Sequence, residues 1–196
     1  MTTTGKEQLA AYIRGVIYLS DEQMEMVLSY FKPSRHPKNE VLVEIGQINQ
    51  YMNFINKGCV RIFFMRDDGL DMTRNITFEN QFATGLASFI SQTPSMEALQ
   101  VLEDTQLLRI SRKDFYYLLN LIDAWEKFFR KYLEYAYLNN LNIYHREIMK
   151  DAAERYKELL SRNPEIVKRL PNKIVASYLN MSPETLSRMK SKIRLI

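Results

Sequence analysis

The feature that most constrains the fold is a long stretch of chain without helix breakers. From Arg112 through Asn163 there is no proline and no glycine, the two residues that most often end or kink a helix. Asp123 with Glu126 forms a capping signal that marks a helix start inside this stretch. If the helix continues to about Met149, it is about 39 Å long at 1.5 Å per residue. The apolar side chains of a helix of this length must pack against other parts of the protein, so we expect the fold to be organised around it.

The apolar residues of this helix follow the spacing of a coiled coil. Six positions lie 4, 3, 4, 3 and 4 residues apart, and one is an asparagine, which often fixes the register of a helix pair. These positions are Trp125, Phe129, Tyr132, Ala136, Asn139 and Ile143. The spacing predicts a homodimer formed through this seam. A long helix buried against its own chain gives the same pattern, and that alternative stays open.

Before this helix, the sequence pattern of residues 33 to 110 is typical of a β domain. Short β-prone runs such as "VLVEI" and "CVRIFFM" are separated by turn signals at Gly46, Gly58 and Gly69. Many short strands with regular turns indicate a sandwich or barrel. The single cysteine, Cys59, excludes an internal disulfide and an iron–sulfur cluster held by cysteines of this chain alone.

The last part of the chain reads as two short helices joined by a tight turn. Pro171 precedes an apolar helical run, Asn180-Met181 forms the turn, and Ser182 is a good N-cap for a second helix with Pro183 at its first position. That second helix has one apolar face and one polar, basic face. The pattern predicts a helix-turn-helix.

The polar face of this second helix carries residue types that can contact DNA bases and phosphates. Arg188 can bond guanine, Glu184 can accept from the cytosine amino group, and Thr185 can contact a thymine methyl or a phosphate. Lysines nearby would bind phosphates, which adds affinity without sequence information. The predicted DNA-binding residues are Ser182, Glu184, Thr185, Arg188, Ser191, Lys192, Lys173 and Lys190. A simply solvated basic face is the alternative.

The order of these parts resembles the Crp/Fnr family of bacterial transcription regulators. The resemblance is carried by "INKGCVRIF", "AAERYKELLSRNPEI" and "IVASYLNMSPETLSRMKSKI". It implies an α+β fold with a cyclic-nucleotide-binding-like sensor β-barrel (jelly roll) in residues 1–121, a long dimerisation helix in 122–149 and an all-α helix-turn-helix domain in 150–196. It also implies double-stranded DNA, a second copy of the chain and RNA polymerase as partners. Relatives usually continue into a β-wing, so a sequence that stops at Ile196 is expected to be a short form without one.

The ligand cassette departs from that family. Its cyclic-AMP binders carry G-E and, about ten residues later, R-[ST]-A. Here the run is "QFATGLASFISQTPSMEAL", and there is no basic residue from Asn75 through Leu108. An unpaired buried phosphate costs on the order of several kcal/mol, so cyclic AMP is not expected to bind. The residues expected to line this degenerate pocket are Phe82, Ala83, Thr84, Ser95 and Met96.

Other cofactors and functions have little support. Only His36 and His145 could ligate a heme, and we expect no metal site and no cofactor. There is no G-x-S-x-G, P-loop or Rossmann fingerprint, so an enzyme is not expected. Without an apolar signal core or membrane span, we expect a cytoplasmic protein. The sequence thus favours a homodimeric DNA-binding transcription regulator. The alternative is a barrel-based sensor whose degenerate C-terminal helices bind a protein partner.

Overall fold

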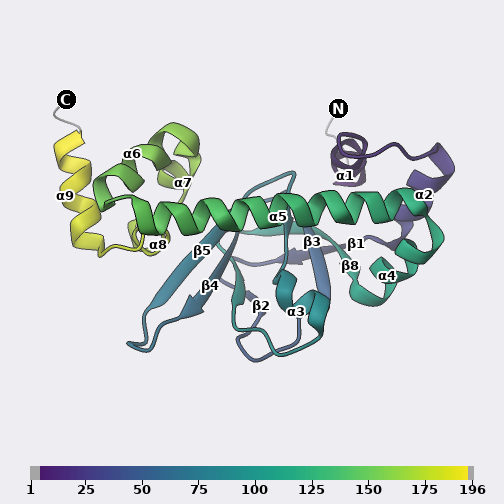
Figure 1. Ribbon diagram of the computed structural model, residues 1–196, viewed down its shortest axis with the longest axis horizontal. Coiled ribbons are helices and arrows are strands. Elements are labelled where there is room, and N and C mark those ends of the chain that lie inside the picture. Colours follow the sequence, from purple (N-terminus) through teal and green to yellow (C-terminus); the bar gives the residue numbers. More distant parts are fainter. Residues whose placement is uncertain (1–4, 194–196) are drawn as a thin grey trace. The chain divides into compact units, whose positions relative to one another are not determined.

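The computed structural model describes residues 5–193, and it describes side chains as far as Ser191. The chain has the predicted mixed α and β fold, with strands in its first part and helices in its last (Figure 1). It divides into two compact units, the first of Met1–Ile62 and Thr77–Tyr137 and the second of Phe63–Ile76 and Leu138–Ile196. This division differs from the predicted domain boundaries, because it falls inside the long helix and groups a β-hairpin with the C-terminal helices.

The helices and strands have the following bounds. The helices are α1 (Gly5–Arg14), α2 (Asp21–Tyr30), α3 (Leu86–Ser91), α4 (Arg112–Leu121), α5 (Asp123–Met149), α6 (Ala152–Arg162), α7 (Pro164–Arg169), α8 (Asn172–Tyr178) and α9 (Pro183–Ile193). The strands are β1 (Lys32–His36), β2 (Val41–Val43), β3 (Tyr51–Lys57), β4 (Val60–Met65), β5 (Asp71–Thr77), β6 (Phe82–Ala83), β7 (Ala98–Val101) and β8 (Thr105–Ser111). The long helix begins and ends where the sequence predicts.

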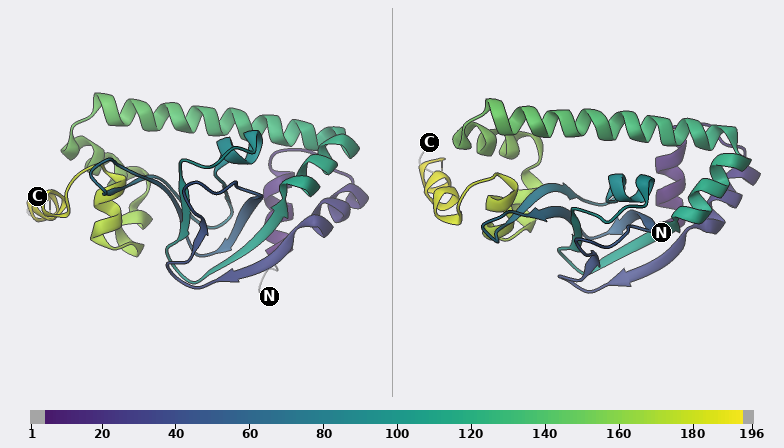
Figure 2. Two further views of the ribbon diagram at one scale, coloured as in Figure 1. Left: turned by 90° about the horizontal axis from the view of Figure 1, so that it is seen from below. Right: turned by 60° about the horizontal axis from the view of Figure 1, so that its bottom comes forward.

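The strands form two four-stranded sheets, in the orders β1-β8-β3-β6 and β2-β7-β4-β5. Figure 2 shows the ribbon of the same strands from two further sides. Strand β3 pairs antiparallel with β8, so that Met52 lies opposite Ile110 and Phe54 opposite Leu108. All four of these side chains are buried. The predicted barrel is therefore present as two sheets that enclose apolar side chains.

The main core of the first unit is aromatic. It joins residues of α1, α2, α4 and the first half of α5 to side chains of β3, β6 and β8. Phe31, Phe54, Phe115, Trp125 and Phe128 are each at most 1% exposed. Fully burying a side chain of this size contributes about 1.5–3 kcal/mol, so this cluster contributes strongly to the stability of the unit.

Side-chain caps close the starts of two helices, α2 and α6. At α2, the Ser20 hydroxyl accepts from Gln23 N at 3.2 Å, and the Gln23 side chain accepts from Ser20 N at 3.1 Å. At α6, Asp151 Oδ1 accepts from Ala153 N at 2.8 Å and from Glu154 N at 2.9 Å. These caps satisfy amide groups that have no partner within the helix.

One tight turn leaves no room for a side chain. Gly58, between β3 and β4, has φ of +104°, and a Cβ atom there would lie 2.4 Å from Thr105 Oγ1 and 2.9 Å from Thr105 Cα. Gly46 has φ of +86°, yet a Cβ atom there would meet nothing within 4 Å. Comparing alanine substitutions at the two positions therefore distinguishes the cost of a left-handed backbone from the cost of a steric clash.

We predict that Gly46→Ala destabilises the protein by about 1 kcal/mol, the cost of a left-handed backbone alone. Gly58→Ala should cost at least about 3 kcal/mol, because it adds a clash with backbone that cannot move freely. Urea unfolding followed by circular dichroism measures both changes. Equal losses for the two variants would show that the space at Gly58 is not restricted.

Candidate nucleic-acid interface

The predicted helix-turn-helix is formed by α8, a tight turn and α9. Asn180 takes the left-handed conformation, with φ of 49°, and Met181 N donates to Ala176 O at 3.0 Å. Val175 on the first helix, Leu179 directly after it and Leu186 on the second helix are fully buried. The apolar face of α9 is thus fixed against α8, which leaves the opposite face of α9 outward.

The N-terminus of α9 carries an ionised acidic group. Ser182 caps the helix by accepting from Thr185 N at 3.2 Å, as predicted. The pKa of Glu184 is lowered, first by a hydrogen bond from its own backbone N–H, then by the Ser182 hydroxyl and by the charge of Arg188. Glu184 is therefore a charged acceptor near neutral pH, at a helix end that favours negative charge.

The structure exposes most of the predicted DNA-binding residues. Ser182, Glu184, Arg188, Ser191 and Lys173 are exposed, and Thr185 is half-buried. Lys190 is also half-buried and donates to Asn172 Oδ1, so it ties α9 to the start of α8. The side chain of Lys192 lies outside the described residues.

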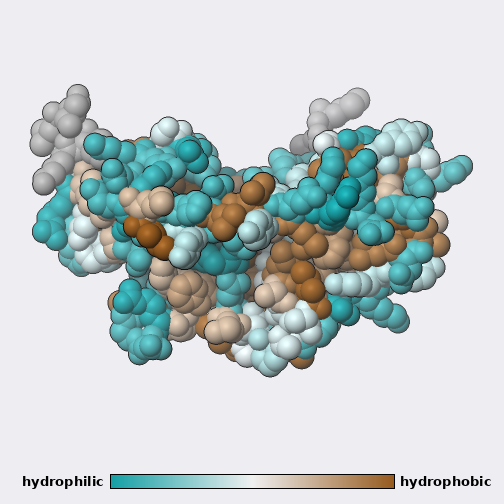
Figure 3. Space-filling view, viewed as in Figure 1, coloured by the Kyte–Doolittle hydropathy of each residue, from teal (hydrophilic) through white to brown (hydrophobic). Residues whose placement is uncertain are grey.

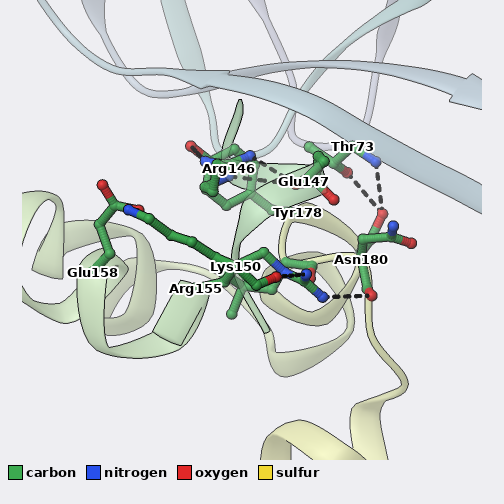
Figure 4. A network of polar contacts seen from close by, with 10 residues as sticks. Thr73, Arg146, Glu147, Lys150, Arg155, Glu158, Tyr178 and Asn180 are labelled. Atoms are coloured by element: carbon green, nitrogen blue, oxygen red, sulfur yellow. Dashed lines mark hydrogen bonds and ion pairs between the residues drawn. The ribbon is translucent and has the colours of Figure 1, made fainter. Parts of the chain in front are cut away.

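Arg155 of α6 holds the helix-turn-helix in place, a role that the sequence did not reveal. Its guanidinium donates to three carbonyl oxygens, Lys150 O at 2.7 Å, Leu179 O at 3.0 Å and Asn180 O at 3.4 Å (Figure 4). It therefore joins the end of α5 to the turn before α9. Because its acceptors are backbone groups, no motif marks them in the sequence.

A second anchor lies between α5 and α8. Arg146 Nη1 donates to the Tyr178 hydroxyl at 2.8 Å, and the guanidinium lies 4.5 Å from the centre of the Tyr178 ring. Arg146 also pairs with Glu147 at 3.3 Å. A cation over a tyrosine face and a charge-assisted hydrogen bond fix α8 on this segment of α5.

The β4–β5 hairpin also contacts α8. The Ser177 hydroxyl accepts from Thr73 N at 2.9 Å and donates to Asp71 O at 3.0 Å. Thr73 is 2% exposed, although it lies near the tip of a hairpin. This contact joins segments about a hundred residues apart in sequence and could not be read from local patterns.

The residues predicted to line a ligand pocket are mostly used by the fold. Phe82 belongs to the main aromatic core, with its ring centre 5.2 Å from that of Phe54. Ala83 is 1% exposed and packs in a smaller core, whereas Met96 is 85% exposed. Ser95 is buried, and its hydroxyl donates to Glu97 O at 2.7 Å.

A buried polar network occupies the region of the cassette. Asn49 is fully buried, and its Nδ2 donates to Thr84 Oγ1 at 2.7 Å and to Gly85 O at 3.2 Å. Ser88 Oγ accepts from Asn49 N at 3.0 Å, and Thr84 Oγ1 donates to Tyr51 O at 3.1 Å. These groups are satisfied by one another. Asn49 and Ser88 could not be predicted from the sequence, because only tertiary packing brings them to Thr84.

The structure corrects the predicted dimer seam at its first positions. Trp125 is fully buried in the chain's own core, stacked on Phe128 at 4.5 Å between ring centres. Phe129 packs on Phe115 at 5.0 Å, and Tyr132 on Phe82 at 6.0 Å. The prediction is wrong for Trp125, because a helix buried against its own domain shows the same apolar spacing as a coiled coil.

The later seam positions, Ala136, Asn139 and Ile143, are half-buried. A different stripe of α5 is more exposed, with Tyr137 65%, Tyr144 60% and Ile148 62% exposed and Leu141 half-buried between them. Apolar side chains are visible among hydrophilic neighbours over this helix in Figure 3. The four positions are spaced 4, 3 and 4 residues apart. This is the spacing that a paired helix requires.

Neither histidine is placed as a metal ligand. His36 Nδ1 lies 2.9 Å from Glu40 Oε1 and its Nε2 lies 3.0 Å from Ser34 Oγ. His145 is next to the Tyr144 ring. Within residues 5–193, no group of three or more potential ligand side chains is gathered as a metal site. In the same range, no helix combines the length and the apolar character needed to cross a membrane.

Comparisons with known proteins agree with this architecture. Residues 33–121 match the sequence family described as Cyclic nucleotide-binding domain. A comparison with curated proteins gives no match. Among solved structures, FixK2 from Bradyrhizobium japonicum is 15% identical, with 84% of this chain and 85% of that chain covered and a TM-score of 0.73.

Two further structures cover nearly the whole chain. The c-di-GMP responsive global regulator CLP from Xanthomonas campestris is 18% identical, with 90% and 92% of the two chains covered and a TM-score of 0.70. A Crp/Fnr family transcriptional regulator from Eubacterium rectale is 13% identical, with 90% and 84% covered and a TM-score of 0.69. Identities this low show a shared fold. The predicted resemblance to Crp/Fnr regulators is confirmed at that level.

Proposed function

We propose that this protein is a homodimeric transcription regulator of the Crp/Fnr type that binds palindromic duplex DNA through α9. The observation that carries the proposal is that α9 has one buried apolar face and one exposed charged face. Leu186 is fully buried on one face, while Glu184 and Arg188 are exposed one turn apart on the other. A helix held on its apolar side and bearing both a charged donor and a charged acceptor outward is suited to the major groove.

The residues divide into two roles. Arg188 would donate two hydrogen bonds to guanine, and the ionised Glu184 would accept from the cytosine amino group. Lys173, exposed at the start of α8, would contact phosphate and position the helix without reading sequence. Lys190 is less available for DNA, since it already bonds Asn172. A regulator of this kind would act on cytoplasmic DNA together with RNA polymerase.

The dimer would form through the exposed stripe of α5 rather than through the whole predicted seam. Tyr137, Leu141, Tyr144 and Ile148 offer a helical face at coiled-coil spacing, and a second copy would present the same face across a two-fold axis. Two recognition helices related by that axis would meet half-sites about one helical turn apart, roughly 34 Å.

Cyclic AMP control is not part of the proposal. Position 84 carries a buried threonine that hydrogen-bonds Asn49 and Tyr51, and position 95 carries a buried serine that bonds Glu97. Arg109 does not supply the missing cation, because its Nε donates to Asn53 Oδ1 at 2.9 Å and its guanidinium lies 4.1 Å from the Tyr51 ring centre. A cyclic phosphate would enter this region without a positive partner.

We predict that Arg188→Ala lowers specific DNA affinity by about 1–3 kcal/mol and relaxes preference at one base pair of each half-site. Lys173→Ala is the matched control. It should weaken specific and random duplexes alike and reduce the slope of log affinity against log salt by about one unit. Fluorescence anisotropy on a site selected from random duplexes measures both. Binding that selects no palindrome and does not change with salt would favour the protein-binding alternative.

For the dimer, we predict that Tyr144→Glu gives monomers in sedimentation velocity while the unfolding midpoint stays near that of the wild type. The charge enters an exposed face, so the folded chain tolerates it. Phe129→Glu should instead destabilise folding by about 2–4 kcal/mol, because its ring packs on the chain's own core. A wild-type protein that is monomeric at micromolar concentration would contradict the dimer.

For the ligand, we predict no saturable heat when cyclic AMP is titrated to millimolar concentration, and no change in DNA affinity. A ligand shifts an equilibrium only by its differential affinity for two states, so one that does not bind shifts nothing. Isothermal titration calorimetry and anisotropy with added nucleotide are the measurements. Micromolar binding would mean that the Thr84 and Ser95 network opens to admit a phosphate.

A further inference from the structure

The second unit contains a hollow whose walls are strongly basic. It has a volume of about 290 Å³ and lies among the end of α5, α6 and Tyr178 of α8. Its lining includes Arg146, Lys150, Arg155 and Arg162, with Glu158 as the acidic side chain. None of the residues proposed to read DNA lines it.

The charges around this hollow do not balance. Lys150 Nζ lies 2.8 Å from Glu158 Oε2, and Arg162 Nε lies 3.2 Å from Glu158 Oε1, so two cations share one carboxylate. Arg155 makes its three hydrogen bonds to carbonyl oxygens, which carry no net charge.

Arg146 is paired with Glu147. Four cations therefore face two carboxylates among the described residues, which leaves a surplus of two positive charges. The pKa of Glu158 is lowered, first by the hydrogen bond from Lys150 and also by the charges of Lys150, Arg162 and Arg146.

The cationic groups keep donors available for a ligand. An ammonium has three N–H groups and a guanidinium has five. Lys150 uses one in its bond to Glu158, and Arg155 uses three. Two of the cationic side chains are also held in place without a ligand, Arg155 by carbonyls and Arg146 by Tyr178 (Figure 4). Donors fixed in advance bind with a smaller entropic cost.

We propose that this hollow binds a small phosphorylated ligand carrying two negative charges, such as a phosphate monoester. A dianion matches the surplus of two charges. The volume is at the lower end of the usual range for ligand pockets, so a monoester with a small organic group fits better than a dinucleotide. Ile143, Met149 and the Tyr178 ring supply the apolar part of the wall.

Binding at this place would bear on DNA recognition, a consequence that rests on the proposed function. The walls come from the α5 segment, from α6 and from the first helix of the helix-turn-helix. Arg155 connects the hollow directly to the turn before α9, through Leu179 O and Asn180 O. A ligand bridging Lys150, Arg155 and Arg162 would stabilise one arrangement of these helices and shift affinity for DNA accordingly.

The experiment titrates phenyl phosphate into the full-length protein at pH 8, where a monoester is fully dianionic. Lys150→Gln removes one cation of the hollow and leaves Arg155 and Arg146 in place. Lys157→Gln is the matched control, because Lys157 is an exposed lysine of α6, the helix that follows Lys150, and does not line the hollow. We expect saturable binding to the wild type, at least tenfold weaker binding to Lys150→Gln, and less than a twofold change for Lys157→Gln. Thermal unfolding of each variant confirms that it is folded.

Three results would overturn the proposal. The first is no saturable heat at millimolar phenyl phosphate. The second is an equal loss in Lys150→Gln and Lys157→Gln, which would indicate only diffuse attraction to a basic surface. The third is a Lys150→Gln variant whose DNA binding loses about one unit of salt slope, because the cations would then be contacts to the duplex backbone. Phenyl phosphate binding is measured without DNA, so failure of the DNA-binding proposal would leave this test unaffected.

Discussion

The packing of one face of α5 into the chain's own aromatic core is the constraint on which most of the structure depends. Trp125 and Phe128 are stacked and almost fully buried, and Phe129 and Tyr132 pack beside them. Once this face is committed to the first unit, it cannot pair with a second chain. The proposed dimer would therefore use another stripe of the same helix, and Tyr137, Leu141, Tyr144 and Ile148 provide one at coiled-coil spacing.

The C-terminal helices are held by polar contacts to backbone and to buried hydroxyl groups. Arg155 binds three carbonyl oxygens, Arg146 binds Tyr178, and Ser177 binds the β4–β5 hairpin. Small helical units bury little apolar surface, so charge-assisted hydrogen bonds contribute a larger share of their stability. The same arginines create the basic hollow, and its proposed ligand would act on contacts that already position α9.

The strand domain contains a buried polar network in the region of the predicted cassette. The buried amide of Asn49 satisfies Thr84 and the carbonyl of Gly85, and Ser88 satisfies the Asn49 backbone. A closed network of this kind is stable because each buried polar group has a partner. Admitting a cyclic phosphate would break these bonds without offering a cation in return. The proposal that cyclic AMP does not bind rests on this network.

The sequence by itself determined the long helix and the helix-turn-helix of this protein, because caps, breakers and apolar spacing are local. The bounds of α5, the Ser182 and Asp151 caps and the outward face of α9 with Glu184 and Arg188 all follow from neighbours a few residues apart. Tertiary structure decided which surface each apolar stripe covers and which polar groups meet. Trp125 has the spacing of a dimer seam but lies in the core, and Asn49 meets Thr84 across the barrel. Periodicity defines a face of a helix, and only the packed chain defines what lies against it.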